Sequence, residues 1–215
     1  MPQIRAVLFD FGQVLSGPPD PLAWRRMQMI LNTTDAALHN SYWRHRHDYD
    51  LGVLNGVDFW RTVGDELGHP LTEAELAQLL EIDVDLWTQP NQPMIDWTIS
   101  LQSAGVPTGI LSNMGDAMET GIFDRCSWLS GFPHHTFSHR LKIAKPDERI
   151  YHHAIKGIDQ APDATLFLDD RIENVEAARS VGLNAIHYTT DEALLRSLQK
   201  FNLADLPMPA CAIID

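Results

Sequence analysis

Carboxylates follow two short apolar segments of this chain at the points where those segments end. Ala6-Val7-Leu8-Phe9 is followed by Asp10, and Thr165-Leu166-Phe167-Leu168 is followed by Asp169 and Asp170. An aspartate can act as a nucleophile, and carboxylates held close together repel one another unless a cation offsets their charge. Mg²⁺ prefers such oxygen ligands and keeps positions open for a substrate phosphate. If the fold brings these residues together, they indicate Mg²⁺-dependent chemistry at an aspartate.

Further polar groups that could contact an anion lie beside other segments. Ser112 and Asn113 follow Gly109-Ile110-Leu111 and offer a hydroxyl and an amide, and Lys145 stands directly before Pro146. A lysine can neutralise a phosphoryl oxygen or hold a carboxylate nucleophile in place. Taken singly, each of these groups is also typical of an ordinary surface turn. Their convergence in space would make them a site.

The apolar segments have the pattern of buried strands in a parallel sheet. Residues 6–9, 109–111, 165–168 and 184–188 are short, apolar on both faces and bounded by polar or turn residues. In open α/β sheets, ligands bind beyond the carboxyl ends of the strands. We therefore predict a three-layer α/β/α, Rossmann-like parallel sheet in which the polar groups after the first three segments converge.

Helical patterns lie between these strands. Residues 172–181 place an apolar side chain at every third position before Gly182, which is a common helix end. Residues 147–155 are predicted to form a helix that opens with Pro146 and has two acidic residues in its first turn. Residues 71–86 begin with a Thr-x-x-Glu capping box.

The segment 17–90 differs, because it is rich in Trp, Leu, Arg and His and has few strand signals. We predict a helical domain of residues 17–90 inserted into an α/β core domain of residues 1–16 and 91–215. Its hinges would be Gly17-Pro18-Pro19 and Gln89-Pro90-Asn91-Gln92-Pro93. Large aromatics dominate small cores, so most tryptophans of this segment are expected inside it, with one stacking on a substrate as the alternative. They are Trp24, Trp43, Trp60 and Trp87.

Composition narrows the class of protein. The chain has 215 residues, 44% hydrophobic and 21% charged, which is typical of a globular protein with a sizeable core. Its net charge of −13 argues against nucleic acid or a membrane surface as a partner. The two cysteines, Cys126 and Cys211, indicate neither a disulfide framework nor a metal site. Without a signal-peptide or membrane-span pattern, we expect a cytoplasmic protein, either a monomer or a homodimer.

The ordered set of motifs resembles the haloacid dehalogenase superfamily of hydrolases over nearly the whole chain. Each motif alone is weak, but four of them occur in the order that this family has. The helical insertion after the first motif looks like the family's cap domain in its common helical form. The matching stretches are Val7-Leu8-Phe9-Asp10-Phe11-Gly12-Gln13-Val14-Leu15, Ile110-Leu111-Ser112-Asn113, Lys145-Pro146-Asp147-Glu148-Arg149-Ile150-Tyr151 and Phe167-Leu168-Asp169-Asp170-Arg171-Ile172-Glu173-Asn174-Val175.

The resemblance implies a role for each catalytic residue. Asp10 would attack phosphorus and form an aspartyl-phosphate. Ser112 would hydrogen-bond the phosphoryl group with help from the backbone of Asn113, and Lys145 would bridge that group and Asp10. The activity implied is a phosphatase for a small phosphorylated metabolite.

The resemblance also implies a Mg²⁺ site. Asp10, the backbone carbonyl of Gly12 and Asp170 would be ligands, and Asp169 would be a ligand or a neighbour that supports one. Asn174 would support the ligands from behind. The cap residues would cover the site, exclude water and select the leaving group.

One position departs from the phosphatase pattern. Most phosphatases of the family have a second aspartate two residues after the nucleophile, which acts as general acid and base, and here that residue is Gly12. General acid–base help is typically worth about 10²–10⁴-fold. We therefore expect slow turnover, a good leaving group or another acid from the insertion, for which the histidines offer the chemistry. Those histidines are His39, His45, His47 and His69.

The same glycine occurs in a branch of the superfamily close to glucose-1-phosphate phosphatase-like proteins, so activity is compatible with it. Two other interpretations stay open. In a haloacid dehalogenase proper, Asp10 would attack carbon and displace halide without a metal, although those relatives usually have Ser-x-Asn where this chain has Asp169-Asp170. In a noncatalytic or regulatory protein of this fold, the loss of the acid at Gly12 would mark a lost activity.

Overall fold

The computed structural model describes residues 3–203 and 206–210 and contains one parallel sheet of five strands in the order β3-β2-β1-β4-β5. Each neighbouring pair of strands is parallel, so all carboxyl ends lie at one edge of the sheet. The strands are β1 (Ala6–Phe9), β2 (Thr108–Ser112), β3 (His134–Phe137), β4 (Thr165–Asp169) and β5 (Asn184–His187).

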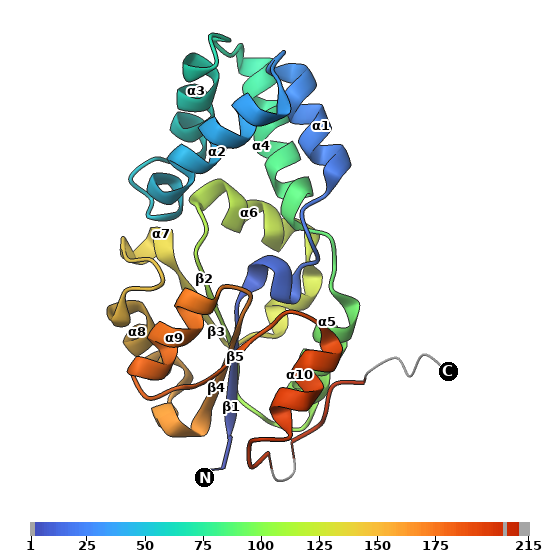
Figure 1. Ribbon diagram of the computed structural model, residues 1–215, viewed down its shortest axis with the longest axis vertical. Coiled ribbons are helices and arrows are strands. Elements are labelled where there is room, and N and C mark those ends of the chain that lie inside the picture. Colours follow the sequence, from blue (N-terminus) through green and yellow to red (C-terminus); the bar gives the residue numbers. More distant parts are fainter. Residues whose placement is uncertain (1–2, 204–205, 211–215) are drawn as a thin grey trace.

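Helices cover both faces of this sheet, as Figure 1 shows. The helices that follow the first strand in the core are α5 (Gln92–Ser103), α6 (Asp116–Arg125), α7 (Ser138–Leu141), α8 (Glu148–Ile158), α9 (Ile172–Ser180) and α10 (Asp191–Leu198). Side chains of β1 alternate between two hydrophobic clusters: Val7 and Phe9 join the cluster of α5, α6 and α10, and Ala6 and Leu8 join that of α8 and α9. The fold is therefore the predicted three-layer α/β/α sheet.

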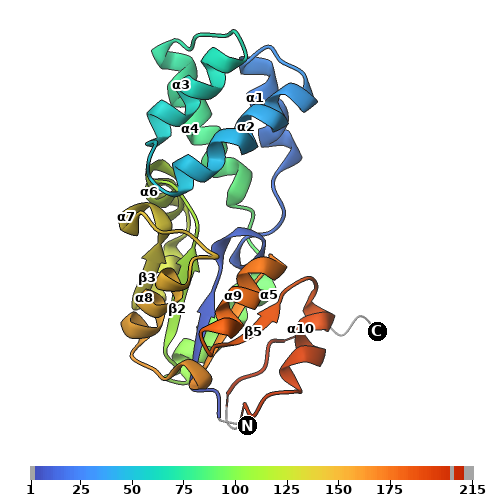
Figure 2. The same ribbon diagram turned by 60° about the vertical axis from the view of Figure 1, so that its left-hand side comes forward.

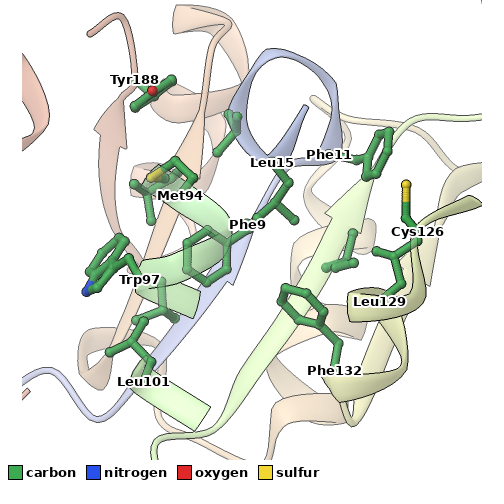
Figure 3. Packing of buried hydrophobic residues seen from close by; sticks show 14 of the residues in the cluster. Phe9, Phe11, Leu15, Met94, Trp97, Leu101, Cys126, Leu129, Phe132 and Tyr188 are labelled. Atoms are coloured by element: carbon green, nitrogen blue, oxygen red, sulfur yellow. The ribbon is translucent and has the colours of Figure 1, made fainter. Parts of the chain in front are cut away.

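Aromatic side chains fill the first of these clusters. Phe9 meets Trp97 and Phe132 edge-on, with ring centroids 5.6 and 6.1 Å apart (Figure 3). Such edge-to-face pairs add to the free energy of burying the rings. Because Phe9 is fully buried in this cluster, the position of Asp10, the next residue, is fixed by the core.

Four helices stand together at the end of the molecule where the strands point (Figures 1 and 2). They share a hydrophobic cluster of their own, which includes Tyr42, Phe59 and Trp60. On this basis we propose that residues 17–90 form a separate domain. The four helices are α1 (Pro21–Ile30), α2 (Asp35–Asp50), α3 (Gly56–Glu66) and α4 (Glu73–Trp87).

The chain enters and leaves these helices through two adjacent segments. Ser16 and Pro90 form an antiparallel bridge, and the Gly17 N–H donates to the Gln89 carbonyl at 2.6 Å. The second hinge is shorter than predicted, because α5 begins at Gln92. Paired in this way, the two connections enter and leave the helical segment side by side.

Several predicted elements are confirmed, and some details were wrong. The Thr72 capping box is present at α4, and Gly182 takes a positive φ of 90° after α9. Helix α8 begins at Glu148 with the Asp147 side chain accepting from the Arg149 N–H, so Pro146 lies before the helix rather than in it. Strand β3 was missed, because it lacks an apolar run and lies at an edge of the sheet.

Two further expectations concern cysteine and membranes. Cys126 is a buried free thiol, and Cys211 lies outside the described residues. Within residues 3–203 and 206–210, no helix combines the length and the hydropathy needed to cross a membrane.

The contact between Gly115 and Tyr49 joins α2 to the core and predicts a sensitive position. A Cβ at Gly115 would lie 1.9 Å from the Tyr49 ring, whose hydroxyl accepts from the Met118 N–H at 3.1 Å. We expect Gly115→Ala to lower the free energy of unfolding by about 1–3 kcal/mol, as overpacking does. Urea unfolding measures this loss. Gly17→Ala is the matched control, because its Cβ would meet only ordinary contacts of 3.5 Å or more, and an equal loss in both variants would contradict the prediction.

Candidate active site

Three carboxylates meet at the carboxyl edge of the sheet. Strand β1 lies between β2 and β4, so Asp10, at the end of β1, is flanked by Ser112 on one side and by Asp169 and Asp170 on the other. One oxygen each of Asp10, Asp169 and Asp170 lie within 4.8 Å of one another. The structure thus brings together the carboxylates singled out in the sequence.

Lys145 is buried between two of these carboxylates. Its Nζ lies 3.0 Å from Asp10 Oδ1 and 2.6 Å from Asp169 Oδ2, and it also donates to the Leu111 carbonyl at 3.0 Å. The lysine side chain is 1% exposed. A cation held in this way orients the Asp10 carboxylate and offsets one of the three negative charges.

The remaining charge is not offset by the protein side chains of the cluster. Burial raises the pKa of Asp10 to about 7, the repulsion from Asp169 and Asp170 acts in the same direction, and Lys145 opposes it. Burial and the neighbouring Asp169 also raise the pKa of Asp170. Burial disfavours the charge on Lys145, but the two aspartates outweigh it and raise the pKa of the lysine. The cluster therefore favours an added cation.

Asp169 and Asp170 have different surroundings. Asp169 is fully buried, and its oxygens accept from Lys145, from the Arg171 N–H at 2.8 Å and from the Asn174 amide at 3.0 and 3.1 Å. Asp170 is half-buried and lines the cavity described below. The structure therefore places Asp169 as a support that fixes Lys145, while Asp170 is the more accessible carboxylate.

Asn113 is engaged with the backbone of Lys145. Its side-chain amide donates to the Lys145 carbonyl at 3.0 Å, and its carbonyl oxygen accepts from the Lys145 N–H at 2.8 Å. This pair ties the end of β2 to the segment that carries the lysine. Ser112 is buried and lines the same cavity, and its hydroxyl lowers the pKa of Asp10 as a minor contribution against the larger effect of burial.

The turn Phe11–Leu15 after Asp10 positions two further residues. The Asp10 carboxylate accepts from the Phe11 N–H at 2.7 Å, and Gly12 has φ −63° and ψ 127°. Gln13 takes a left-handed φ of 56°, and its side chain donates to Asp170 Oδ2 at 2.7 Å. Sequence reasoning missed Gln13, because nothing in its residue type signals that the turn aims it at Asp170.

A cavity of about 120 Å³ lies between these residues and the inserted helices. Trp43 and Arg46 of α2 and Trp87 of α4 line it on the side of the insertion. Trp60 is fully buried inside the insertion, as is expected for a core residue. Of the tryptophans considered in the sequence, Trp43 and Trp87 are the two that could contact a substrate.

The candidate histidines lie elsewhere. None of the four is among the residues that line the cavity; His45 pairs with Glu66 at 2.7 Å and His69 with Glu75 at 3.0 Å. Within the described residues, the carboxylic acids that line the cavity are Asp10 and Asp170. In the part of the chain that the structure describes, none of the four histidines therefore lies at the cavity to replace the acid missing at Gly12.

The donor set fits Mg²⁺. The three side chains offer carboxylate oxygens alone, which are the ligands that hard divalent cations prefer. The cluster has three carboxylates and one lysine, so a divalent cation would balance its charge. Asp10 and Asp170 line the cavity and could hold such a cation, whereas Asp169 is fully buried.

The sheet and its carboxylates define a hydrolase of the haloacid dehalogenase type. A family model of haloacid dehalogenase-like hydrolases matches residues 4–182. The chain belongs to this family.

Three known proteins are similar to the chain. A sesquiterpene phosphatase from Aspergillus oryzae is 25% identical over 210 residues, which are 91% of this chain and 95% of the relative. An (S)-2-haloacid dehalogenase from a Pseudomonas strain is 26% identical over 158 residues, 68% of this chain and 69% of that protein. A haloacid dehalogenase-family enzyme from Bacteroides thetaiotaomicron has the same fold, with a TM-score of 0.74, 16% identity and coverage of 91% and 99% of the two chains. That enzyme has also been solved with magnesium and inorganic phosphate, in a structure that gives a TM-score of 0.70 at 17% identity and covers 86% and 94% of the two chains.

Proposed function

We propose that this hydrolase is a Mg²⁺-dependent phosphatase that acts on a small phosphorylated metabolite through an aspartyl-phosphate. The observation that carries the proposal is the cluster of Asp10, Asp169 and Asp170 around buried Lys145. Displacement of halide from carbon needs no metal, so such a crowded carboxylate cluster has no use in that reaction. The phosphatase among the relatives and the magnesium and phosphate bound in the Bacteroides enzyme support the same choice.

The residues of this chain supply the nucleophile and its surroundings. The Asp10 carboxylate attacks phosphorus, the bond to the ester oxygen breaks, and the alkoxide or phenolate leaves with the electron pair. Water then cleaves the aspartyl-phosphate to release inorganic phosphate and restore the Asp10 carboxylate. Lys145 holds the attacking carboxylate and would neutralise the phosphoryl oxygens, and the Ser112 hydroxyl and the Asn113 backbone would donate to them.

A Mg²⁺ ion, when bound, supplies positive charge to the phosphoryl oxygens. Asp10, Asp170 and the Gly12 carbonyl would hold it, and Asp169 and Asn174 would keep the neighbouring groups in place. The inserted helices cover the site and exclude water from it. The leaving oxygen, however, would have no acid from position 12 beside it, because this chain has Gly12 where most phosphatases of the family have an aspartate.

The experiment is a phosphate-release assay on phosphorylated sugars, nucleotides and 4-nitrophenyl phosphate, with Mg²⁺ and with EDTA. We expect release that requires both Mg²⁺ and Asp10, with an Asp10→Asn variant as the inactive control. 4-Nitrophenyl phosphate should react fastest, because 4-nitrophenolate leaves without a proton.

Two outcomes would reject the proposal. Chloride release from a 2-chloroalkanoic acid in EDTA, lost in Asp10→Asn, would assign the dehalogenase reaction. Absence of both products, in protein that binds neither Mg²⁺ nor inorganic phosphate, would assign a noncatalytic role.

A further inference from the structure

The geometry points to a hydrocarbon group as the alcohol half of the substrate, rather than a polyol or a second anion. This inference rests on the proposed phosphatase function and names its substrate class. It comes from one part of the cavity lining, here called the wall, which consists mainly of aromatic and methionine side chains together with Arg46.

The apolar side chains of this wall come from both parts of the molecule. The insertion contributes Trp43 and Trp87, whose rings meet edge-on with centroids 6.2 Å apart. The core contributes Phe11, Met114 and Met118, each about 2% exposed. Flat rings and polarizable methionines suit a hydrocarbon, because they offer contact area without polar groups that would need partners.

Arg46 is the charged residue that the insertion contributes to this wall, and its charge is already balanced. Its Nε donates to Asp50 Oδ1 at 2.8 Å, and its guanidinium lies 3.8 Å from Asp83 Oδ1. It also donates to the Tyr42 hydroxyl and stacks over the Trp87 ring at 5.6 Å. Buried Asp83 and partly buried Asp50 together face the one buried guanidinium, so the insertion brings no excess positive charge to this wall that would attract an anion.

Hydroxyl groups of a sugar would also lack partners there. Asp83 is 2% exposed and accepts from the Tyr42 hydroxyl at 2.8 Å, and Asp50 is engaged with Arg46. Binding a polyol against aromatic rings and methionines would remove water from its hydroxyls without replacing those hydrogen bonds, which is unfavourable. A hydrocarbon has no hydrogen bonds to lose on the same transfer, and burying its apolar surface is favourable.

The test uses a series of substrates whose leaving groups have nearly the same acidity. The series is the 4-methyl-, 4-ethyl-, 4-propyl- and 4-butylphenyl phosphates, with 4-(hydroxymethyl)phenyl and 4-(carboxymethyl)phenyl phosphate as polar comparators. Because every leaving group is a phenol, the acid missing at Gly12 affects all members alike. We expect kcat/KM to rise up to about fourfold for each methylene that stays inside the cavity, and both polar comparators to fall below the 4-methyl compound.

A Trp43 variant tests whether the dependence of kcat/KM on alkyl chain length comes from this wall. Trp43 is 46% exposed, so Trp43→Ala is expected to fold, and it should flatten the dependence on chain length. Leu22→Ala is the control, because Leu22 is a 65% exposed apolar residue of the same insertion that does not line the cavity. It should leave the series unchanged.

Calorimetric binding of benzylphosphonate and 4-butylbenzylphosphonate, which the protein cannot hydrolyse, separates this inference from the proposed function. Tighter binding of the butyl compound without turnover of any ester would reject the phosphatase and keep the hydrocarbon site. Turnover with no gain from the alkyl chain, or with a preference for the hydroxymethyl or carboxymethyl compound, would overturn the inference and keep the phosphatase. Failure of both binding and turnover would overturn both.

Discussion

Gly12→Asp is expected to raise kcat by about 10²–10⁴-fold on esters with poor leaving groups, which is the usual worth of a general acid and base. The position accepts a side chain. Its φ of −63° suits any residue, and a Cβ built there meets no atom within 4 Å. Gly12 also lines the cavity beside Asp10, so the new carboxyl would reach the leaving oxygen.

The dependence of the gain in kcat on the leaving group shows whether the new aspartate acts by proton transfer. A phenyl or benzyl ester needs a proton on its departing oxygen, so its kcat should rise most, while 4-nitrophenyl phosphate should gain little. Gly12→Asn is the matched control, because it adds nearly the same volume without an acid. The same gain in Gly12→Asn, or an equal gain for all esters, would show that the aspartate acts by something other than proton transfer.

The sequence predicted those site residues that are polar and stand at the end of a buried strand. Asp10, Ser112 and Asp169 each close or follow a buried strand, and parallel strands bring such ends to one edge without further information. Lys145 belongs to no strand, and its place depended on the resemblance. The structure adds why it lies there, since Asn113 holds its backbone through two hydrogen bonds.

The cavity wall could not be predicted in the same way. Trp43 and Trp60 are both helical tryptophans of the insertion, yet one faces the cavity and the other is buried in the helical core. Which side of a helix faces the site depends on how the insertion docks, and contacts such as that of Tyr49 with Gly115 set this docking. Arg46 stands between two histidines in the sequence, and nothing in that pattern indicates that its side chain lines the cavity.

Lys145→Met is expected to lower the free energy of unfolding by about 3–5 kcal/mol, because removing one partner leaves buried charges unpaired. Asp10 and Asp169 both lose their ion pair, and Asp169 is fully buried. Urea unfolding in EDTA measures this loss. Lys156→Met changes the same residue type on the exposed side of α8 and should have little effect. A similar small change in both variants would contradict the prediction.

A second substitution separates folding from catalysis. The double variant Lys145→Met/Asp169→Asn removes the negative charge of Asp169 together with the lysine that balanced it, so much of the lost stability should return. Catalysis should not return, because the phosphoryl group still lacks the lysine ammonium. We expect the loss of this ammonium to lower kcat by about 10²–10³-fold, as the loss of one electrostatic contact to a reacting oxygen does. Recovery of both stability and turnover in the double variant would mean that Lys145 serves only to balance Asp169. Recovery of stability alone would mean that the lysine, held by Asp169 and Asn113, acts on the substrate itself.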